Sequence, residues 1–148
     1  MTTTRIRLST LSPEVYKAML ALDEAAAAGL DKPLAELVRV RASLLNGCTY
    51  CLDTHTKDAR AGGETEQRLY LLSAWRESPR LYTEKEQAAL ALTEAITLLS
   101  QEHVPDAVYE QAAAHFPDAE LSQLISQIIM INAWNRLGVA TRLGPSPS

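Results

Sequence analysis

The apolar residues of this chain recur mostly at intervals of three and four, which is the spacing of one face of an α-helix. Runs of alternating β-branched or aromatic residues, which would predict strands, are not found. Alanine, leucine, glutamate and glutamine dominate the periodic stretches, and glycine and proline fall between them. The pattern predicts helices at residues 13–29, 33–46, 48–61, 65–76, 83–99, 105–114 and 118–140. We therefore expect an all-α, compact helical domain of about six to seven helices.

The chain reads as a single domain. Its 148 residues show no internal repeat, low-complexity linker or second domain, so we assign residues 1–148 to one unit with a core at about 13–140. Thr83 and Glu86 have the T-x-x-E spacing of a capping box at the start of an alanine- and leucine-rich helix. We expect the first ten residues to form an arm or a partly ordered lead-in, and the GPSPS tail at 144–148 to be frayed.

The predicted last helix is apolar around much of its circumference. The apolar side chains that exceed one narrow stripe are Leu121, Leu124, Ile125, Ile128, Ile129, Ile131, Trp134 and Leu137. Such a helix lies in the middle of its own core or against another subunit, and in a domain of this size we expect both, and so a homo-oligomer. Asn132, Asn135 and Arg136 interrupt the apolar surface, and we expect them to satisfy backbone groups at a subunit contact rather than to act in catalysis. Trp75 and Trp134 are expected to be core or interface anchors.

The composition excludes several classes of function. Hydrophobic residues make up 47% of the chain and charged residues 22%, which is an ordinary globular composition. The net charge of -4 and the absence of a basic cluster argue against a nucleic-acid partner. The longest apolar runs, such as Ala18–Leu22, fall far short of the roughly 20 residues that span a bilayer. The first residues also lack the apolar core of a signal peptide, so we expect a cytoplasmic protein.

Both cysteines of the chain lie close together, and this pair is the strongest chemical signal in the sequence. Cys48 and Cys51 are three residues apart, and His55 follows four residues later. In the cytoplasm a close cysteine pair points to metal binding or catalysis more than to a structural disulfide. A redox dithiol, a metal site and ordinary core packing are the three candidate interpretations. Asn46-Gly47 resembles a helix stop, which would place Cys48 at the start of the next helix.

A helix beginning at Cys48 would bring the chemical groups to one face. At 100° per residue, the residues that fall within about a 100° arc are Cys48, Cys51, Leu52, His55, Ala59 and Gly62. Residues three apart on a helix have Cα atoms about 5 Å apart, so a disulfide between the two cysteines is feasible. A thiol in the first turn also feels the positive end of the helix dipole, which favours the thiolate. His55, one turn beyond Cys51, can take the proton or stabilise the anion.

A carboxylate from the preceding helix can reach the same site. Almost no loop joins the helices before and after Gly47, so they can fold back as an αα-hairpin. Glu36 lies about 16 Å back from Gly47 along one helix, and His55 lies about 12 Å along the other. If the helices are antiparallel, Glu36 sits near the level of His55. It could then orient His55 and accept protons from it.

The spacing of Glu36, Cys48, Cys51 and His55 resembles the signature of the alkylhydroperoxidase D-like group in the carboxymuconolactone decarboxylase family. The stretches SAWRESPRLYTEKEQAALALTEAIT and NAWNR are also similar to that group, and the likeness covers roughly residues 15–140. The resemblance implies an all-helical oligomer, often a trimer or hexamer. It also implies a dithiol that reduces hydroperoxides, in which Cys51 attacks the peroxide, Cys48 resolves the product, and Glu36 with His55 relays protons.

We therefore expect a thiol-dependent hydroperoxide reductase of the peroxiredoxin type, an antioxidant enzyme that uses no metal or organic cofactor and is reset by an unidentified external dithiol. Where the founding enzyme carries a second histidine between its cysteines, this chain has Thr49-Tyr50. One alternative is a general disulfide reductase or dithiol relay with little peroxidase activity. Another is a non-catalytic oligomer whose Cys48, Cys51, His55 and Glu36 hold zinc.

Overall fold

The computed structural model describes residues 4–145 and residue 147, and every regular element in that part of the chain is helical. The α-helices are α1 (Leu8–Leu11), α2 (Pro13–Ala27), α3 (Lys32–Asn46), α4 (Thr49–Ala61), α5 (Glu66–Tyr70), α6 (Glu84–Thr97), α7 (Leu99–Glu102), α8 (Asp106–His115) and α9 (Asp118–Thr141). Two 3-10 helices, η1 (Leu72–Glu77) and η2 (Pro79–Leu81), lie between α5 and α6. The predicted all-α class is confirmed. None of these helices is both long enough and apolar enough to cross a membrane.

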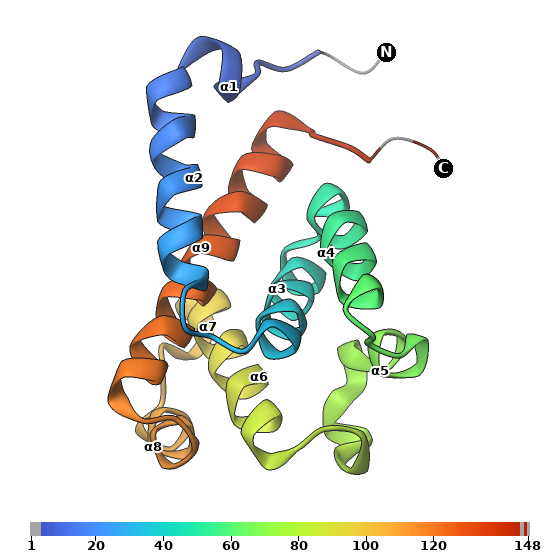
Figure 1. Ribbon diagram of the computed structural model, residues 1–148, viewed down its shortest axis with the longest axis vertical. Helices are drawn as coiled ribbons and strands as arrows, with labels where there is room; N and C mark the ends of the chain where they lie inside the picture. Colours follow the sequence, from blue (N-terminus) through green and yellow to red (C-terminus); the bar gives the residue numbers. More distant parts are fainter. Residues whose placement is uncertain (1–3, 146, 148) are drawn as a thin grey trace.

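Helix α3 is the central element of the fold (Figure 1). It packs against α4, α6 and α9, and α2 lies alongside α9. Leu37, Val38 and Val40 of α3 are almost completely buried, and they contribute to two apolar clusters. One cluster joins α3 to α6, α8 and α9, and the other joins it to α4, α5, η1 and α6. Because α4, α6 and α9 all pack against α3, the polar side chains that α3 places between these helices are held in fixed surroundings.

The turn between α3 and α4 takes the predicted form. Asn46 ends α3, and Gly47 adopts the left-handed conformation with φ 65°, which costs most residues but not glycine. Cys48 is then the N-cap of α4, and its Sγ accepts a hydrogen bond from the backbone N–H of Cys51 at 3.3 Å. The turn therefore places the first cysteine at the positive end of α4.

Helix α9 anchors this turn from the other side. The Nδ2 of Asn46 donates to Oδ1 of Asn132 at 3.0 Å and to Oδ1 of Asn135 at 2.9 Å. Asn135 in turn donates to Oγ of Ser43 at 2.9 Å. The expectation of a subunit contact is wrong for these two asparagines, because both are buried and form their bonds within the chain. They connect the end of α3 to α9 and so hold the start of α4 in place.

The predicted helix over 65–76 is interrupted in the structure. Helix α5 ends at Tyr70, and Ala74 in the following η1 has non-helical dihedral angles. The carbonyl of Arg68, which would accept a bond from residue 72 in a continuing helix, instead accepts from the hydroxyl of Tyr82 at 2.6 Å. The break turns Leu72 and Trp75 into the core.

The ends of the chain and of one further helix also differ from expectation. The lead-in contains the short helix α1, and residues 1–3 lie outside the described residues. The predicted helix over 83–99 divides into α6 and α7, although its T-x-x-E capping box at Thr83 and Glu86 is confirmed. In the tail that we expect to be frayed, residues 146 and 148 lie outside the described residues.

Candidate active site

Glu36 and His55 meet between α3 and α4. Oε2 of Glu36 lies 3.0 Å from Nδ1 of His55, so the predicted proximity of the two side chains is confirmed. The two helices pack closely along their lengths, which is the antiparallel hairpin expected from the short turn. Both side chains are mostly buried, so the hydrogen bond is protected from competing water.

The direction of this hydrogen bond fixes which ring nitrogen of His55 can act as a base. An ionised carboxylate only accepts hydrogen bonds, so Nδ1 carries the proton that it donates to Glu36. Nε2 is then the nitrogen with a free lone pair in the neutral ring. Histidine held in this way has the tautomer and orientation needed to take a proton at Nε2.

Arg39 binds the other oxygen of Glu36. Its Nη1 donates to Oε1 of Glu36 at 2.5 Å, and its Nη2 donates to Oε1 of Gln127 on α9 at 2.8 Å. Burial raises the pKa of Glu36, but the hydrogen bond from His55 and the charge of Arg39 outweigh burial, and the net pKa is lowered. Glu36 is therefore an anion at neutral pH, which favours orienting His55 over accepting its proton.

Cys48 and Cys51 are joined as a disulfide, and their Cα atoms lie 5.3 Å apart. The helical spacing thus permits the bond, as predicted. The two residues are only 1% and 4% exposed and pack with Ala42 and Ile131. Because the two residues are buried, a reagent can reach the sulfurs only through a cavity that borders them.

Gly138 of α9 lies directly against the sulfurs. A Cβ atom at this position would lie 2.8 Å from Sγ of Cys48 and 3.8 Å from Sγ of Cys51. The first distance is too short for carbon and sulfur, so only glycine lets α9 approach this closely. The sequence interpretation does not include Gly138. A glycine inside a long apolar helix, where it lowers helix stability, is the signal that could have indicated it.

Cys51 and His55 line the same cavity, which has a volume of about 220 Å³. Its walls are largely apolar and include Leu20, Leu137 and the ring of Trp134. The indole N–H of Trp134 donates to Asp23 at 3.2 Å, and its ring meets Tyr16 edge to face at 5.7 Å. Trp134, expected to be a core or interface anchor, is thus part of the site wall. A small molecule in this cavity would lie beside both Cys51 and His55.

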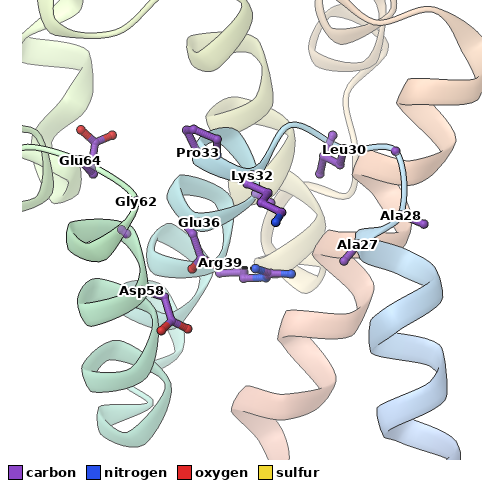
Figure 2. A pocket seen from close by; sticks show the side chains of 13 residues that line it. Ala27, Ala28, Leu30, Lys32, Pro33, Glu36, Arg39, Asp58, Gly62 and Glu64 are labelled. Carbon is purple, nitrogen blue, oxygen red and sulfur yellow. Dashed lines mark hydrogen bonds and ion pairs between the residues drawn. The ribbon is translucent and has the colours of Figure 1, made fainter.

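A second cavity has a volume of about 770 Å³, and Glu36 is among the residues that line it (Figure 2). Glu36, Arg39 and Asp58 line it, as does Lys32. His55 lines the first cavity and Glu36 lines the second. The hydrogen bond between them therefore connects a residue of one cavity to a residue of the other.

The face predicted for α4 is largely observed. Cys48, Cys51 and Ala59 are buried, and His55 is partly buried. Gly62 is exposed, and its assignment to the buried face is wrong because α4 ends at Ala61. The helical angle of 100° per residue does not apply beyond that point.

The residues proposed as zinc ligands do not form one group. Among the described residues, the group with suitable atoms within 4.8 Å of one another consists of Glu36, His55 and Asp58. The two sulfurs are bonded to each other, and the guanidinium of Arg39 binds Glu36. A cation at Glu36 would be repelled by Arg39, so this donor set is poorly suited to a metal ion.

The chain is similar to proteins of several bacteria. It is 39% identical over 137 residues to the uncharacterized protein YdfG of Bacillus subtilis (strain 168), covering 92% of each chain. It is 32% identical over 112 residues to the uncharacterized protein YnjA of Escherichia coli (strain K12), covering 75% of this chain and 60% of YnjA.

Two solved structures share the fold. One is a protein of unknown function from Agrobacterium tumefaciens, whose name suggests the antioxidant defence protein AhpD. It matches 98% of this chain and 100% of its own length at 40% identity, with a TM-score of 0.93. The other is an uncharacterized peroxidase-related protein from Silicibacter sp. TM1040, which matches 91% of this chain and 72% of its own length at 25% identity, with a TM-score of 0.79.

The family model of the carboxymuconolactone decarboxylase family matches residues 13–95, a span that runs from α2 into α6 and contains Glu36, both cysteines and His55. This span exceeds half of the chain. The protein belongs to the carboxymuconolactone decarboxylase family.

Proposed function

We propose that the protein is a thiol-dependent hydroperoxide reductase. The observation that carries the proposal is the cavity shared by Cys51 and His55, together with the hydrogen bond by which the ionised carboxylate of Glu36 orients His55. A thiol beside an oriented imidazole is an activated nucleophile. Membership of a family with an AhpD-like structural neighbour supports the same chemistry.

The first half of the proposed cycle takes place at Cys51. Nε2 of His55 takes the thiol proton, and the thiolate attacks the terminal oxygen of the hydroperoxide. The O–O bond breaks, the proton passes from His55 to the departing alkoxide, and an alcohol leaves. Cys51 is oxidised to a sulfenic acid, and the peroxide is reduced.

The second half closes the disulfide. The thiolate of Cys48, stabilised at the N-cap of α4 by the N–H of Cys51, attacks the sulfur of the sulfenic acid. The S–O bond breaks, and hydroxide leaves as water with the proton of Cys48. An external dithiol then reduces the disulfide by two thiol–disulfide exchanges and becomes a disulfide itself.

The walls of the smaller cavity indicate the kind of peroxide. Leu20, Trp134 and Leu137 offer apolar contact next to Cys51. A hydroperoxide with an apolar substituent would bury surface there, which hydrogen peroxide cannot do. We therefore expect organic hydroperoxides to be the better substrates.

A disulfide reductase is the second candidate. The position of Cys48 at a helix N-terminus favours it, because a thiol placed there readily forms a thiolate that attacks disulfides. Turnover of a disulfide substrate with little consumption of peroxide would support this function. A lactone decarboxylase is less favoured, since that chemistry has no evident need for two neighbouring thiols.

The cysteines provide the test. One equivalent of organic hydroperoxide should convert two titratable thiols per chain to none, without linking chains. In Cys48→Ser, the peroxide should leave a sulfenic acid on Cys51 that a dimedone-type probe labels. In Cys51→Ser, the peroxide should react slowly. Retention of both thiols would reject the dithiol cycle, and labelling of Cys48 in place of Cys51 would reverse the two roles.

Metal analysis of the purified protein separates the zinc alternative from this cycle. About one zinc per chain, together with thiols that resist peroxide, would support a structural site.

A further inference from the structure

Glu36 is held on the side opposite His55 by a chain of two side chains. Arg39 donates one N–H to Glu36 at 2.5 Å and another to Gln127 at 2.8 Å, and Gln127 belongs to α9. We propose that Arg39 and Gln127 are positioning residues of the dithiol site, which fix Glu36 so that its remaining oxygen faces His55. The proposal rests on the proposed function insofar as Cys51 is the thiol that His55 activates.

The surroundings of Glu36 explain why it needs a second partner. The carboxylate borders the cavity of about 770 Å³, where water could solvate it in other rotamers (Figure 2). By occupying Oε1, Arg39 leaves Oε2 as the oxygen that meets Nδ1 of His55. Because both of its oxygens are bound, the carboxylate of Glu36 keeps the imidazole of His55 in one orientation, and no further ordering of Glu36 is needed when the thiol reacts.

Gln127 is a polar residue at a fully buried position of α9, where an apolar residue would be expected. It is 0% exposed, and its Nε2 has no hydrogen-bond partner among the described residues. Leaving a buried amide N–H unpaired costs free energy that an apolar side chain would avoid. The contact of its Oε1 with Arg39 is the interaction that gives this amide a role.

The charges around Glu36 allow two opposite effects of Arg39. Arg39 and Lys32 on α3 supply positive charge, while Asp58 on α4 and Glu64 after it supply negative charge to the same cavity. Gln127, the contact from α9, is neutral.

The removal of Arg39 has opposite effects in the two cases. If Arg39 acts by position, its removal weakens the orientation of His55 and slows the reaction of Cys51. If Arg39 acts only by charge, its removal strengthens the pull of Glu36 on the proton of His55 and speeds Cys51.

The test is the rate at which iodoacetamide alkylates Cys51 as a function of pH, measured on the reduced protein in the Cys48→Ser background. Arg39→Met should slow alkylation at pH 7 by about tenfold, the lower range for losing a partner of a functional side chain. The pH at which the alkylation rate begins to increase should also be higher in Arg39→Met than in the parent. Arg39→Lys should recover part of the rate, because the ammonium can still bind Glu36. The recovery should be incomplete, because one ammonium cannot bridge Glu36 and Gln127 in the same geometry.

Gln127→Met separates position from charge, because it removes the anchor of Arg39 and leaves every charge in place. We expect a fall in the same direction, smaller than the roughly tenfold fall in Arg39→Met, because the ion pair between Arg39 and Glu36 remains. This variant also decides the matter if Arg39→Met does not fold.

Arg41→Met is the matched control. Arg41 lies on the same helix, is 12% exposed against 14% for Arg39, and forms a comparable ion pair with Glu94 at 2.8 Å. Its loss changes the net charge equally, and the alkylation profile should match that of the parent. Faster alkylation in Arg39→Met, or an unchanged profile in Gln127→Met, would overturn the proposal. Because alkylation requires no peroxide, a protein that fails as a peroxidase but shows these shifts would refute the proposed function alone.

Discussion

At the scale of single residues, the chemistry depends on the charge that Glu36 keeps. Its pKa is lowered although burial alone would raise it, because His55 and Arg39 both stabilise the anion. A group with a lowered folded-state pKa retains its charge above its ordinary value near 4.5 and loses it only as the pH falls through the lower value. Across the neutral range Glu36 is thus a fixed anion, similar in role to the aspartate of a serine-protease triad.

Replacing Glu36 by glutamine tests this role. Glu36→Gln should fold but alkylate Cys51 at neutral pH roughly ten- to a thousandfold more slowly, the range for loss of general acid–base help. Raising the pH should recover part of the rate, because hydroxide then generates the thiolate unaided. His55→Ala should behave similarly, and the double variant should be little worse than either single one, since the two residues act as a unit. A pH profile of Glu36→Gln identical to that of the wild type would show that Glu36 has no part in activating Cys51.

The residues that can be found from the sequence are those whose neighbours lie close in the chain. Helix geometry across one tight turn is enough to bring Glu36 to His55, and one helical turn is enough to join Cys48 to Cys51. The partners from α9 are different. Gln127 and Gly138 reach the site only through the packing of a helix some 90 residues away along the chain, which no local spacing encodes.

At the scale of helices, the close approach of α9 to the disulfide is the feature that most constrains the site. Helix α9 contacts α2, α3, α4 and α6, so it cannot move away from one without disturbing the others. The absence of a side chain at Gly138 makes this approach possible. The interruption between α5 and η1, in contrast, could not be read from the apolar spacing, because it depends on the hydroxyl of Tyr82 reaching the carbonyl of Arg68.

A methyl group at Gly138 should therefore disturb the sulfurs. In Gly138→Ala, Sγ of Cys48 or α9 must shift, and we expect a loss of about 1–3 kcal/mol in unfolding free energy, as for other overpacked sites. Closure of the disulfide after peroxide treatment should also slow. Denaturant unfolding and the rate of thiol loss measure the two effects.

Gly62→Ala is the control for this substitution, since a Cβ there would lie at an ordinary 3.5 Å from its nearest atoms. It should change neither quantity appreciably. Equal behaviour of the two variants would mean that the contact between α9 and the sulfurs carries no constraint.

At the scale of the whole molecule, apolar side chains remain exposed along two neighbouring helices. Val15 and Leu22 of α2 are 53% and 54% exposed, and Ile129 of α9 is 54% exposed. Helices α2 and α9 lie side by side (Figure 1). The subunit contact expected from the sequence of α9 would need exposed apolar side chains of this kind.

We propose that the protein assembles through this region, and sedimentation tests the proposal. At micromolar concentration the protein should sediment well above 16.2 kDa, as a trimer or hexamer. Ile129→Lys should reduce the assembled fraction, because it places a charge in an apolar contact. Tyr70→Lys, at a site on α5 that is 72% exposed, should leave assembly unchanged. Sedimentation of the wild type as a monomer would contradict the proposal.

The hydrogen bonds from Asn46 to Asn132 and Asn135 determine when the site can form during synthesis of the chain. They tie the start of α4 to α9, which is synthesised after it, and Gln127 and Gly138 belong to that same helix. While the chain is being synthesised, Cys48 and Cys51 have emerged, but the framework that buries them and steadies Glu36 does not yet exist. Their thiols should then react like those of any unfolded peptide. The activated thiol is thus acquired only once α9 has been synthesised and has packed against α3 and α4.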